Sequence, residues 1–298
     1  MKLVEKYGSL FERYGILTSD KVNVQTKDVF RMIVDRLIEH EVVYPEFVET
    51  INVDVLDGKI PIIEDVNEMT PFVPEGAEPR LGDTAKIRQI SFTLKKAKDR
   101  IRITKEAMIR HDRQVIQHIS LDAMAKRLAL REDQEVLDEI NKAVIESFDA
   151  HAKWTESDAD PVSDIAEAIR RIKANVRLTA KERKSLCVVI PDQVESYLRK
   201  YVIQIGGGAI PLYDYIESRL GVKIVPHVLL TKQAFVLPKS TTAVVHLVYD
   251  GKDIPLVQEI EKPEADSIEY YYTKYFATIP IVNQDGKCPF IVRIDNVL

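Results

Sequence analysis

The sequence contains six histidines and two cysteines, the side chains that most often act as nucleophiles or metal ligands. His111 and His118 are seven residues apart, so on a helix they share a face but lie two turns from each other, which does not suit a shared metal ion. Cys187 falls in the apolar run SLCVVI, where a thiol behaves as a small hydrophobic group, and no histidine is near either Cys187 or Cys288 in the sequence. We therefore predict no catalytic residue, no metal site and no cofactor.

Three consecutive glycines, Gly206, Gly207 and Gly208, are a second candidate, because glycine-rich loops can bind phosphate through the backbone. The run lacks both the GxxxxGK[ST] pattern and the GxGxxG sequence that follows a strand and opens a helix. We predict a surface loop here.

Charged residues form two local groups. The carboxylates Glu264, Asp266 and Glu269 are close in sequence, and we expect them on a solvated acidic surface. The clearest charge bias is basic and precedes or lies within a predicted helix: Lys95, Lys96, Lys98, Arg100, Arg102, Lys105, Arg110, Arg113, Lys126, Arg127 and Arg131. Such a segment faces nucleic acid or acidic neighbours, and because it lacks interleaved aromatic residues for base stacking, subunit contact or solubility is the more common role.

The composition belongs to an ordinary globular protein: 298 residues, 45% hydrophobic and 30% charged. This is enough chain for one large or two ordinary domains, and two cysteines cannot form a disulfide framework. The longest uncharged stretch, Tyr201 to Tyr213, is shorter than a membrane span, so no membrane partner is expected. A net charge of -5 argues against sequence-independent nucleic-acid binding by the chain as a whole.

Hydrophobic periodicity divides the first half into helices and an extended arm. A helix is predicted from Thr26, with Val29, Phe30, Ile33, Val34 and Leu37 on one face. Short extended pieces at 53–66 and a strand around 90–94 flank an irregular, Pro- and Glu-rich excursion at 64–83, far longer than the usual hairpin loop. The run KKAKDR is interpreted as a turn before alternation resumes at Ile101. From Thr104 the pattern predicts a long helix to Phe148, either continuous or broken near 131–134.

From Pro161 the pattern changes to alternating helices and strands, which predicts a second domain. Helices are expected at 165–176, 191–201 and 212–220, the last closed by Gly221, and a buried strand is expected at 185–190. Strands dominate the last eighty or so residues, with a turn at 284–286, and the terminal strands can return to the first domain.

Four passages resemble the major capsid proteins of tailed phages and related viruses. FVPEGAEPRLGDTAKIRQISFTLKKAKDRIRITKEAMIRHD resembles the family's extended loop and its passage into a long "spine" helix. The other three are LALREDQEVLDEI, CVVIPDQVESYL and IPLYDYIESRLGVKIVPH. The resemblance covers most of the chain and is carried by loose patterns rather than by any single diagnostic residue.

This resemblance implies an α+β protein with the Hong-Kong-97-type capsid fold. It implies an N-terminal arm (1–28), a peripheral domain with the spine helix (29–57, 104–160 and 264–298), an extended loop (58–103) and an axial domain (161–263). Intersubunit contacts are expected at the loop tip, and Gly206, Gly207 and Gly208 near the centre of a ring. The loop-tip residues are Phe72, Val73, Pro74, Glu75, Gly76, Pro79 and Arg80.

The implied function is self-assembly through pentamers and hexamers into an icosahedral shell around double-stranded DNA. The DNA would be bound without sequence specificity, scaffolding or portal proteins are further expected partners, and the chain would reside in the virion after assembly in the host cytoplasm. Physical chemistry supports self-association independently, because a two-stranded arm cannot bury enough apolar surface alone.

Two alternatives stay open. An encapsulin-like nanocompartment shell would keep the fold and hold enzyme cargo instead of DNA. A dimeric small-molecule enzyme would use the arm as an exchanged dimer interface and the glycine loop as the mouth of its site, but no nucleophile, base or cofactor signature supports it.

Overall fold

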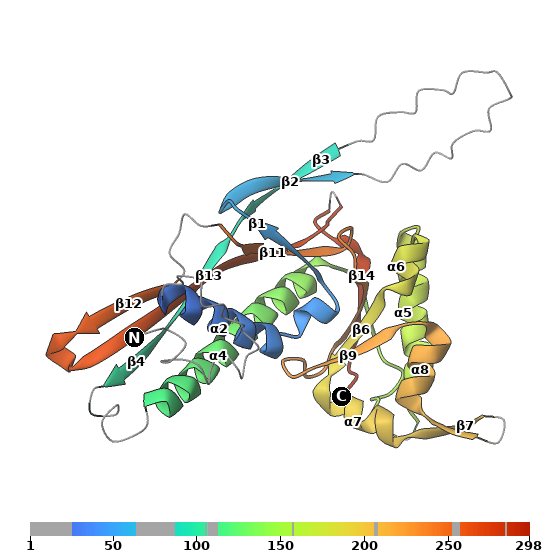
Figure 1. Ribbon diagram of the computed structural model, residues 1–298. Coiled ribbons are helices and arrows are strands. Elements are labelled where there is room, and N and C mark those ends of the chain that lie inside the picture. Colours follow the sequence, from blue (N-terminus) through green and yellow to red (C-terminus); the bar gives the residue numbers. More distant parts are fainter. Residues whose placement is uncertain are drawn as a thin grey trace, which may run out of the picture.

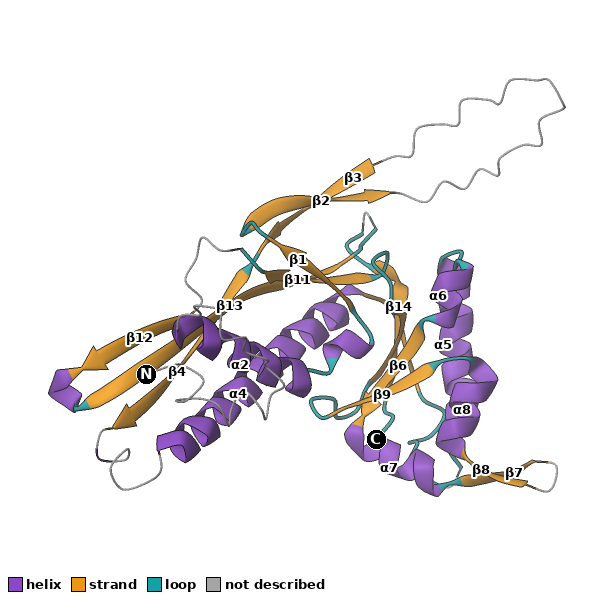
Figure 2. Cartoon of the chain, in the orientation of Figure 1, coloured by secondary structure: helices purple, strands orange, loops and turns teal. Residues whose placement is uncertain are grey.

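The structure is a computed structural model, and it describes residues 26–63, 87–104, 106, 113–156, 158–205, 208–251, 257–283 and 285–298. Two mixed sheets, each covered by helices, lie on either side of one long helix, and a two-stranded hairpin extends away from the body (Figures 1 and 2).

The first sheet is centred on the long strand β13 (Ser267–Pro280). Strands β4 (Lys95–Thr104), β11 (Val244–Tyr249) and β12 (Val257–Lys262) pair with β13 in antiparallel fashion, and β1 (Glu49–Val53) pairs with β11 in parallel. Helices α2 (Thr26–Glu41) and α4 (Arg113–Ala143) pack on one face of this sheet, and their apolar side chains bury Ile101, Tyr270 and Tyr272. A 3-10 turn, η1 (Tyr44–Glu46), follows α2, and another, η2 (Pro263–Ala265), joins β12 to β13.

The second sheet has the order β5-β14-β10-β6-β9. Its strands are β5 (Val144–Asp149), β14 (Cys288–Asp295), β10 (Ala234–Pro238), β6 (Leu186–Pro191) and β9 (Lys223–His227). Helices α5 (Pro161–Asn175), α6 (Ala180–Lys184), α7 (Asp192–Lys200) and α8 (Leu212–Leu220) lie beside it (Figure 1). A small hairpin of β7 (Val202–Ile205) and β8 (Gly208–Pro211) projects from the ends of α7 and α8.

Helix α4 joins the two cores. Its N-terminal half contributes Leu121, Met124 and Leu128 to the core beneath the first sheet. Its C-terminal half contributes Val136 and Ile140 to the large core of the second sheet. Because one rigid helix spans both cores, the two sheets are held at a fixed separation.

Among the described residues, the hairpin of β2 (Asp57–Ile63) and β3 (Ile87–Thr93) packs on the body of the protein at its base. There Phe92 and Leu94 are buried against Val245, Leu247 and Tyr249 of the first sheet. Gly58 lies opposite Phe92, and a Cβ at position 58 would be 2.8 Å from two atoms of the Phe92 ring. Because Gly58 has no side chain, the Phe92 ring can lie against strand β2 at this position.

Most predicted elements are confirmed, and two predictions are wrong. The helix from Thr26, the strand at 186–191, the helices at 192–200 and 212–220, and the left-handed turn at Gly286 are all present. The run KKAKDR is not a turn but the first part of β4, and Val144–Phe148 is a strand rather than the end of a helix. Helix α4 is continuous through 131–134, whereas β7, β8 and β12 were not predicted.

The terminal strands do return to the first half of the chain, as β13 pairs with β4 and β14 with β5. Other pairings join the two sides of the predicted boundary at 263/264, because β11 and β12 pair with β13 and β10 pairs with β14. The division into peripheral and axial domains stays a prediction.

Candidate functional site

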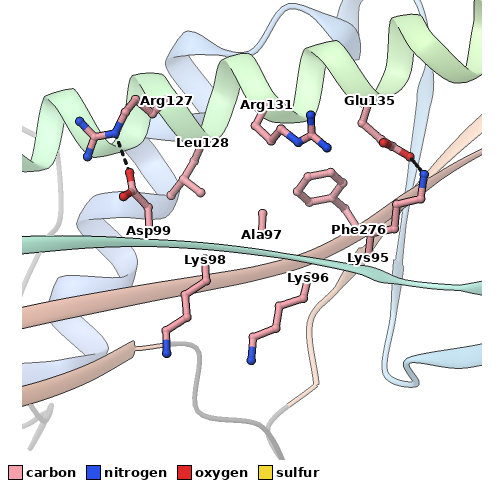
Figure 3. Close-up of a pocket in the computed structure, with 10 residues that line it drawn as sticks. All are labelled: Lys95, Lys96, Ala97, Lys98, Asp99, Arg127, Leu128, Arg131, Glu135 and Phe276. Carbon is pink, nitrogen blue, oxygen red and sulfur yellow. Dashed lines mark hydrogen bonds and ion pairs between the residues drawn. The ribbon is translucent and has the colours of Figure 1, made fainter.

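Strand β4 presents two different faces because its residues alternate across the first sheet. Lys95, Ala97 and Asp99 point toward α4, while Lys96 and Lys98 point away from it (Figure 3). The register with β13 extends this alternation, since Tyr270 lies opposite Ile101 on the helix side and Tyr271 lies opposite Arg100 on the other. The basic run is therefore split between a groove and an outer surface.

The groove between β4 and α4 encloses about 390 Å³. Two ion pairs cross it, one from Arg127 Nε to Asp99 Oδ2 at 2.8 Å and one between Lys95 and Glu135. Leu128 and Phe276 supply the apolar part of its lining (Figure 3). The hydrogen bond to Glu135 raises the pKa of Lys95. The groove therefore fastens α4 to the strand by charge as well as by apolar contact.

The outer surface of the same strands carries a cluster that we call the basic face. It consists of Lys96, Lys98, Arg100 and Arg102 of β4, Lys262 of β12, and Glu269, Tyr271 and Tyr275 of β13. Lys98 lies 4.5 Å from the centre of the Tyr271 ring and Lys96 lies 5.7 Å from that of Tyr275. The sequence interpretation missed these aromatic partners because they are about 175 residues further along the chain.

Glu269 is the acidic centre of the basic face. Its side chain is fully covered, with Arg102 Nε donating to Oε1 at 2.6 Å, the Tyr271 hydroxyl donating to Oε2 at 2.5 Å and Lys262 Nζ 3.5 Å from Oε2. The hydrogen bonds from Tyr271 and Arg102 lower its pKa to about 2. The prediction of a solvated acidic surface at Glu264, Asp266 and Glu269 is therefore wrong for Glu269, because cations of neighbouring strands surround it.

A second charged cluster is buried between α4 and the first sheet. Glu132, which is not exposed at all, accepts hydrogen bonds from Lys274 Nζ at 2.6 Å and the Tyr44 hydroxyl at 3.1 Å, and contacts His246 Nε2 at 3.0 Å. Burial acts to raise the pKa of Glu132, but Lys274 and His246 outweigh it and the pKa is lowered. Thr278 bonds the other ring nitrogen of His246 at 2.9 Å. The cluster joins α4, η1, β11 and β13 at one point.

The next residue of α4, Asp133, fixes the turn after α2. Its carboxylate accepts the backbone N–H groups of Val43 and Tyr44, at 3.2 and 3.0 Å. Burial raises the pKa of Asp133 to about 6, and burial also lowers the pKa of His227, whose Nε2 lies 3.7 Å from Asp133 Oδ2, to about 4. This pair holds the end of β9 against α4. Because both side chains titrate, the contact between β9 and α4 depends on pH.

The predicted contact residues are placed only in part. Phe72, Val73, Pro74, Glu75, Gly76, Pro79 and Arg80 lie outside the described residues, as do Gly206 and Gly207. Gly208 begins β8, at the projecting β7–β8 hairpin. Exposed apolar side chains gather at this hairpin: Tyr197, Tyr201, Val202 and Ile210. The rings of Tyr197 and Tyr201 stack with their centres 6.1 Å apart.

Metal ligands and free thiols are two further kinds of group that could do chemistry in the described part of the chain. No group of three or more His, Cys, Asp and Glu side chains there has the arrangement of a metal site. Burial raises the pKa of Cys187 to about 11 and of Cys288 to about 12, so both thiols are protonated and unreactive at neutral pH. Within the same residues, no helix combines the length and apolar character that a bilayer span requires.

Comparison with known proteins identifies the family. The model of the phage capsid protein family matches residues 88–287, about two thirds of the chain. No curated protein matches the sequence. The chain belongs to the phage capsid protein family, and as a member of it is a structural protein of a shell.

Solved structures share the fold at low sequence identity. The virus-like particle from Pyrococcus furiosus superposes with a TM-score of 0.62 and 12% identity, over 91% of this chain and 100% of that chain. The capsid of Myoviridae phage XM1 gives a TM-score of 0.56 and 11% identity over 85% and 90% of the two chains. The SrpI encapsulin of Synechococcus elongatus gives 0.55 and 10% over 100% and 96%. The Hong-Kong-97-type fold predicted from the sequence is confirmed.

Proposed function

We propose that this chain assembles through pentamers and hexamers of itself into an icosahedral shell around double-stranded DNA. The family match over residues 88–287 is the observation that carries this proposal, because it spans β4, α4 and β13, the elements that form the first sheet and its long helix. The described part of the β2–β3 hairpin supports it physically, since a two-stranded ribbon that packs on the body at its base needs another surface to become stable.

Two contact regions follow from this proposal. Residues Phe72, Val73, Pro74, Glu75, Gly76, Pro79 and Arg80, beyond the end of the hairpin, would contact a neighbouring copy. Gly206, Gly207 and Gly208 would lie near the centre of each ring. The exposed apolar side chains Tyr201 and Val202, at the base of the β7–β8 hairpin, supply surface that a neighbour can cover. Scaffolding or portal proteins would be further partners during assembly in the host cytoplasm.

Electron microscopy of the purified protein tests the proposal. Closed shells that contain nuclease-protected double-stranded DNA are the expected result. A monomer or dimer by light scattering, with no shells at any salt or protein concentration, would contradict it and would favour the dimeric enzyme.

An encapsulin-like compartment is the second candidate. The likeness to the Synechococcus elongatus encapsulin, which spans the whole of this chain, supports it at the level of the fold. Shells that contain a co-purifying enzyme and no protected DNA would support this alternative over the virion.

A further inference from the structure

The end of α5, the short helix α6 and the turn between them form a strongly basic stretch. Residues 170–184 contain seven lysines and arginines and one carboxylate, while the whole chain carries a net charge of -5. Five of these cations are exposed, and none of the five has an ion pair or side-chain hydrogen bond within the described residues. We call them the α5–α6 surface: Lys173, Arg177, Lys181, Arg183 and Lys184.

The fold holds this surface outward. Leu178, in the turn between the helices, is buried in the large core of the second sheet. Glu182, which is also buried, accepts hydrogen bonds from the backbone N–H of Thr179 at 2.7 Å and from the Thr242 hydroxyl at 2.5 Å. Because Leu178 and Glu182 fix the inner side of the turn and of α6, the cations between and beside them remain in solvent.

The carboxylates around this surface are already bonded to other groups. Glu167 is paired with Arg170 and Arg171, at 2.6 and 2.9 Å. Glu146 lies 3.7 Å from Arg171 and accepts a hydrogen bond from Asn175 at 3.1 Å. Three carboxylates, with Glu182 as the third, stand against the seven cations of residues 170–184, so the net charge is +4.

The chemistry of the α5–α6 surface suits the phosphate backbone of double-stranded DNA, whose charge density is high and regular. Residues 170–184 contain no aromatic side chain on which the bases of a single strand could stack. The basic face is less suited, because three of its cations share Glu269 and its other two lie over tyrosine rings. Figure 1 shows α6 and β4 on opposite sides of the molecule, so the two surfaces can be altered separately.

We propose that the α5–α6 surface binds the phosphate backbone of double-stranded DNA without reading its sequence. The proposal rests on the shell function proposed above and deepens it by naming the surface that would contact the enclosed DNA. A single copy would bind weakly, and many copies facing the same DNA molecule would act together.

Binding by the unassembled full-length protein at several salt concentrations tests the proposal. A labelled DNA duplex is titrated and followed by fluorescence anisotropy between about 50 and 200 mM salt. We expect Lys173→Gln/Lys181→Gln/Lys184→Gln to weaken binding about tenfold or more at the lower salt concentration. The slope of the logarithm of the binding constant against that of the salt concentration should fall by about 2–3, because each lost phosphate contact removes about 0.9. An unchanged slope, or no duplex binding by the native protein, overturns the proposal.

A matched variant separates position from net charge. Lys96→Gln/Lys98→Gln/Lys262→Gln removes three lysine charges from the basic face and is expected to bind the duplex with the native slope. Both triple variants should keep the native melting temperature, because the substituted side chains are at least partly exposed. An equal loss of binding in the two variants contradicts the assignment, as does a preference for a single strand or for one of two unrelated duplex sequences.

A second copy of the chain is the alternative occupant. If the native protein does not bind the duplex, and the α5–α6 variant loses shells that the basic-face variant keeps, the surface is a contact between copies and the proposal is wrong. If the duplex binds as expected but electron microscopy finds no shells, the shell function fails while the DNA surface stands. If shells with protected DNA form and the α5–α6 variant keeps the native slope, the shell function stands and this assignment fails.

Discussion

At the scale of residues, Asp133 and His227 change the stability of the fold in opposite directions between about pH 4 and pH 6. The pKa of Asp133 is raised to about 6, so the folded state retains that proton, and the stability it contributes at low pH is lost as the pH rises to about 6. The pKa of His227 is lowered to about 4, so its contribution is present above about 6.5 and is lost as the pH falls to about 4. In the native chain the two effects offset each other.

Removing either partner should expose the effect of the other. Between pH 4 and 6, His227→Gln is expected to lose about 3 kcal/mol of stability as pH rises, and Asp133→Asn to gain a similar amount, because each pKa is displaced by roughly two units. Urea unfolding of unassembled subunits at several pH values measures both slopes. Parallel pH profiles for the two variants would show that the pair is not coupled to folding.

Gly58 is a position where one methyl group should matter. A Cβ there would be 2.8 Å from Phe92 Cε1 and Cζ, and the ring has little room to move because it is packed in the core at the hairpin base. We expect Gly58→Ala to lower the free energy of unfolding by about 1–3 kcal/mol. Lys59→Ala, at the exposed neighbouring position, is the control and should change thermal unfolding little. Equal melting temperatures for the two variants would mean that the ring adjusts freely.

At the scale of elements, the Glu132 cluster fixes helix α4 to the first sheet. Lys274→Met leaves the Glu132 carboxylate buried without its cation, and we expect a loss of about 3–5 kcal/mol in urea unfolding. Adding Glu132→Gln should recover much of this loss, because the carboxylate that Lys274 neutralised is then absent. Lys142→Met removes a pair of similar length, Lys142–Glu139 at 2.9 Å, but the lysine is 67% exposed, so less than about 1 kcal/mol should be lost.

The failures of sequence interpretation also occurred at this scale, and they have physical causes. Val144 and Phe148 are four residues apart, a spacing that places side chains on one face of a helix and equally on one face of a strand. The run KKAKDR has the composition of a turn, because its side chains on the α4 side form ion pairs where a buried strand face usually has apolar residues. The sequence did not identify the buried cluster at Glu132, because His246 and Lys274, which contact this carboxylate, come more than 100 residues later.

At the scale of the whole molecule, the order of elements in the sequence was enough to predict the fold. It was not enough to predict which residues contact one another. The acidic excursion between two extended arms, followed by a long helix and an α/β region, led to the capsid family that the comparison identifies. The partners of the basic face depend on the register between β4 and β13, strands that start about 170 residues apart, and no local pattern specifies that register. The proposed assembly would depend on surfaces that, like the basic face, are built from strands far apart in the sequence.

Deletion of Met69–Gly82 tests whether the excursion serves the subunit or the shell. The base of the β2–β3 hairpin is anchored by Phe92 and Leu94, and the residues left between Ile63 and Ile87 are enough to close the ribbon. We therefore expect an unchanged melting temperature for the unassembled subunit and no closed shells by electron microscopy.

A Gly/Ser segment of equal length in place of Met69–Gly82 is the matched control, since it restores the length of the segment without its native side chains. Because the contacts between copies depend on those side chains, this variant should also fail to assemble, and normal shells from either variant would contradict the role assigned to the excursion.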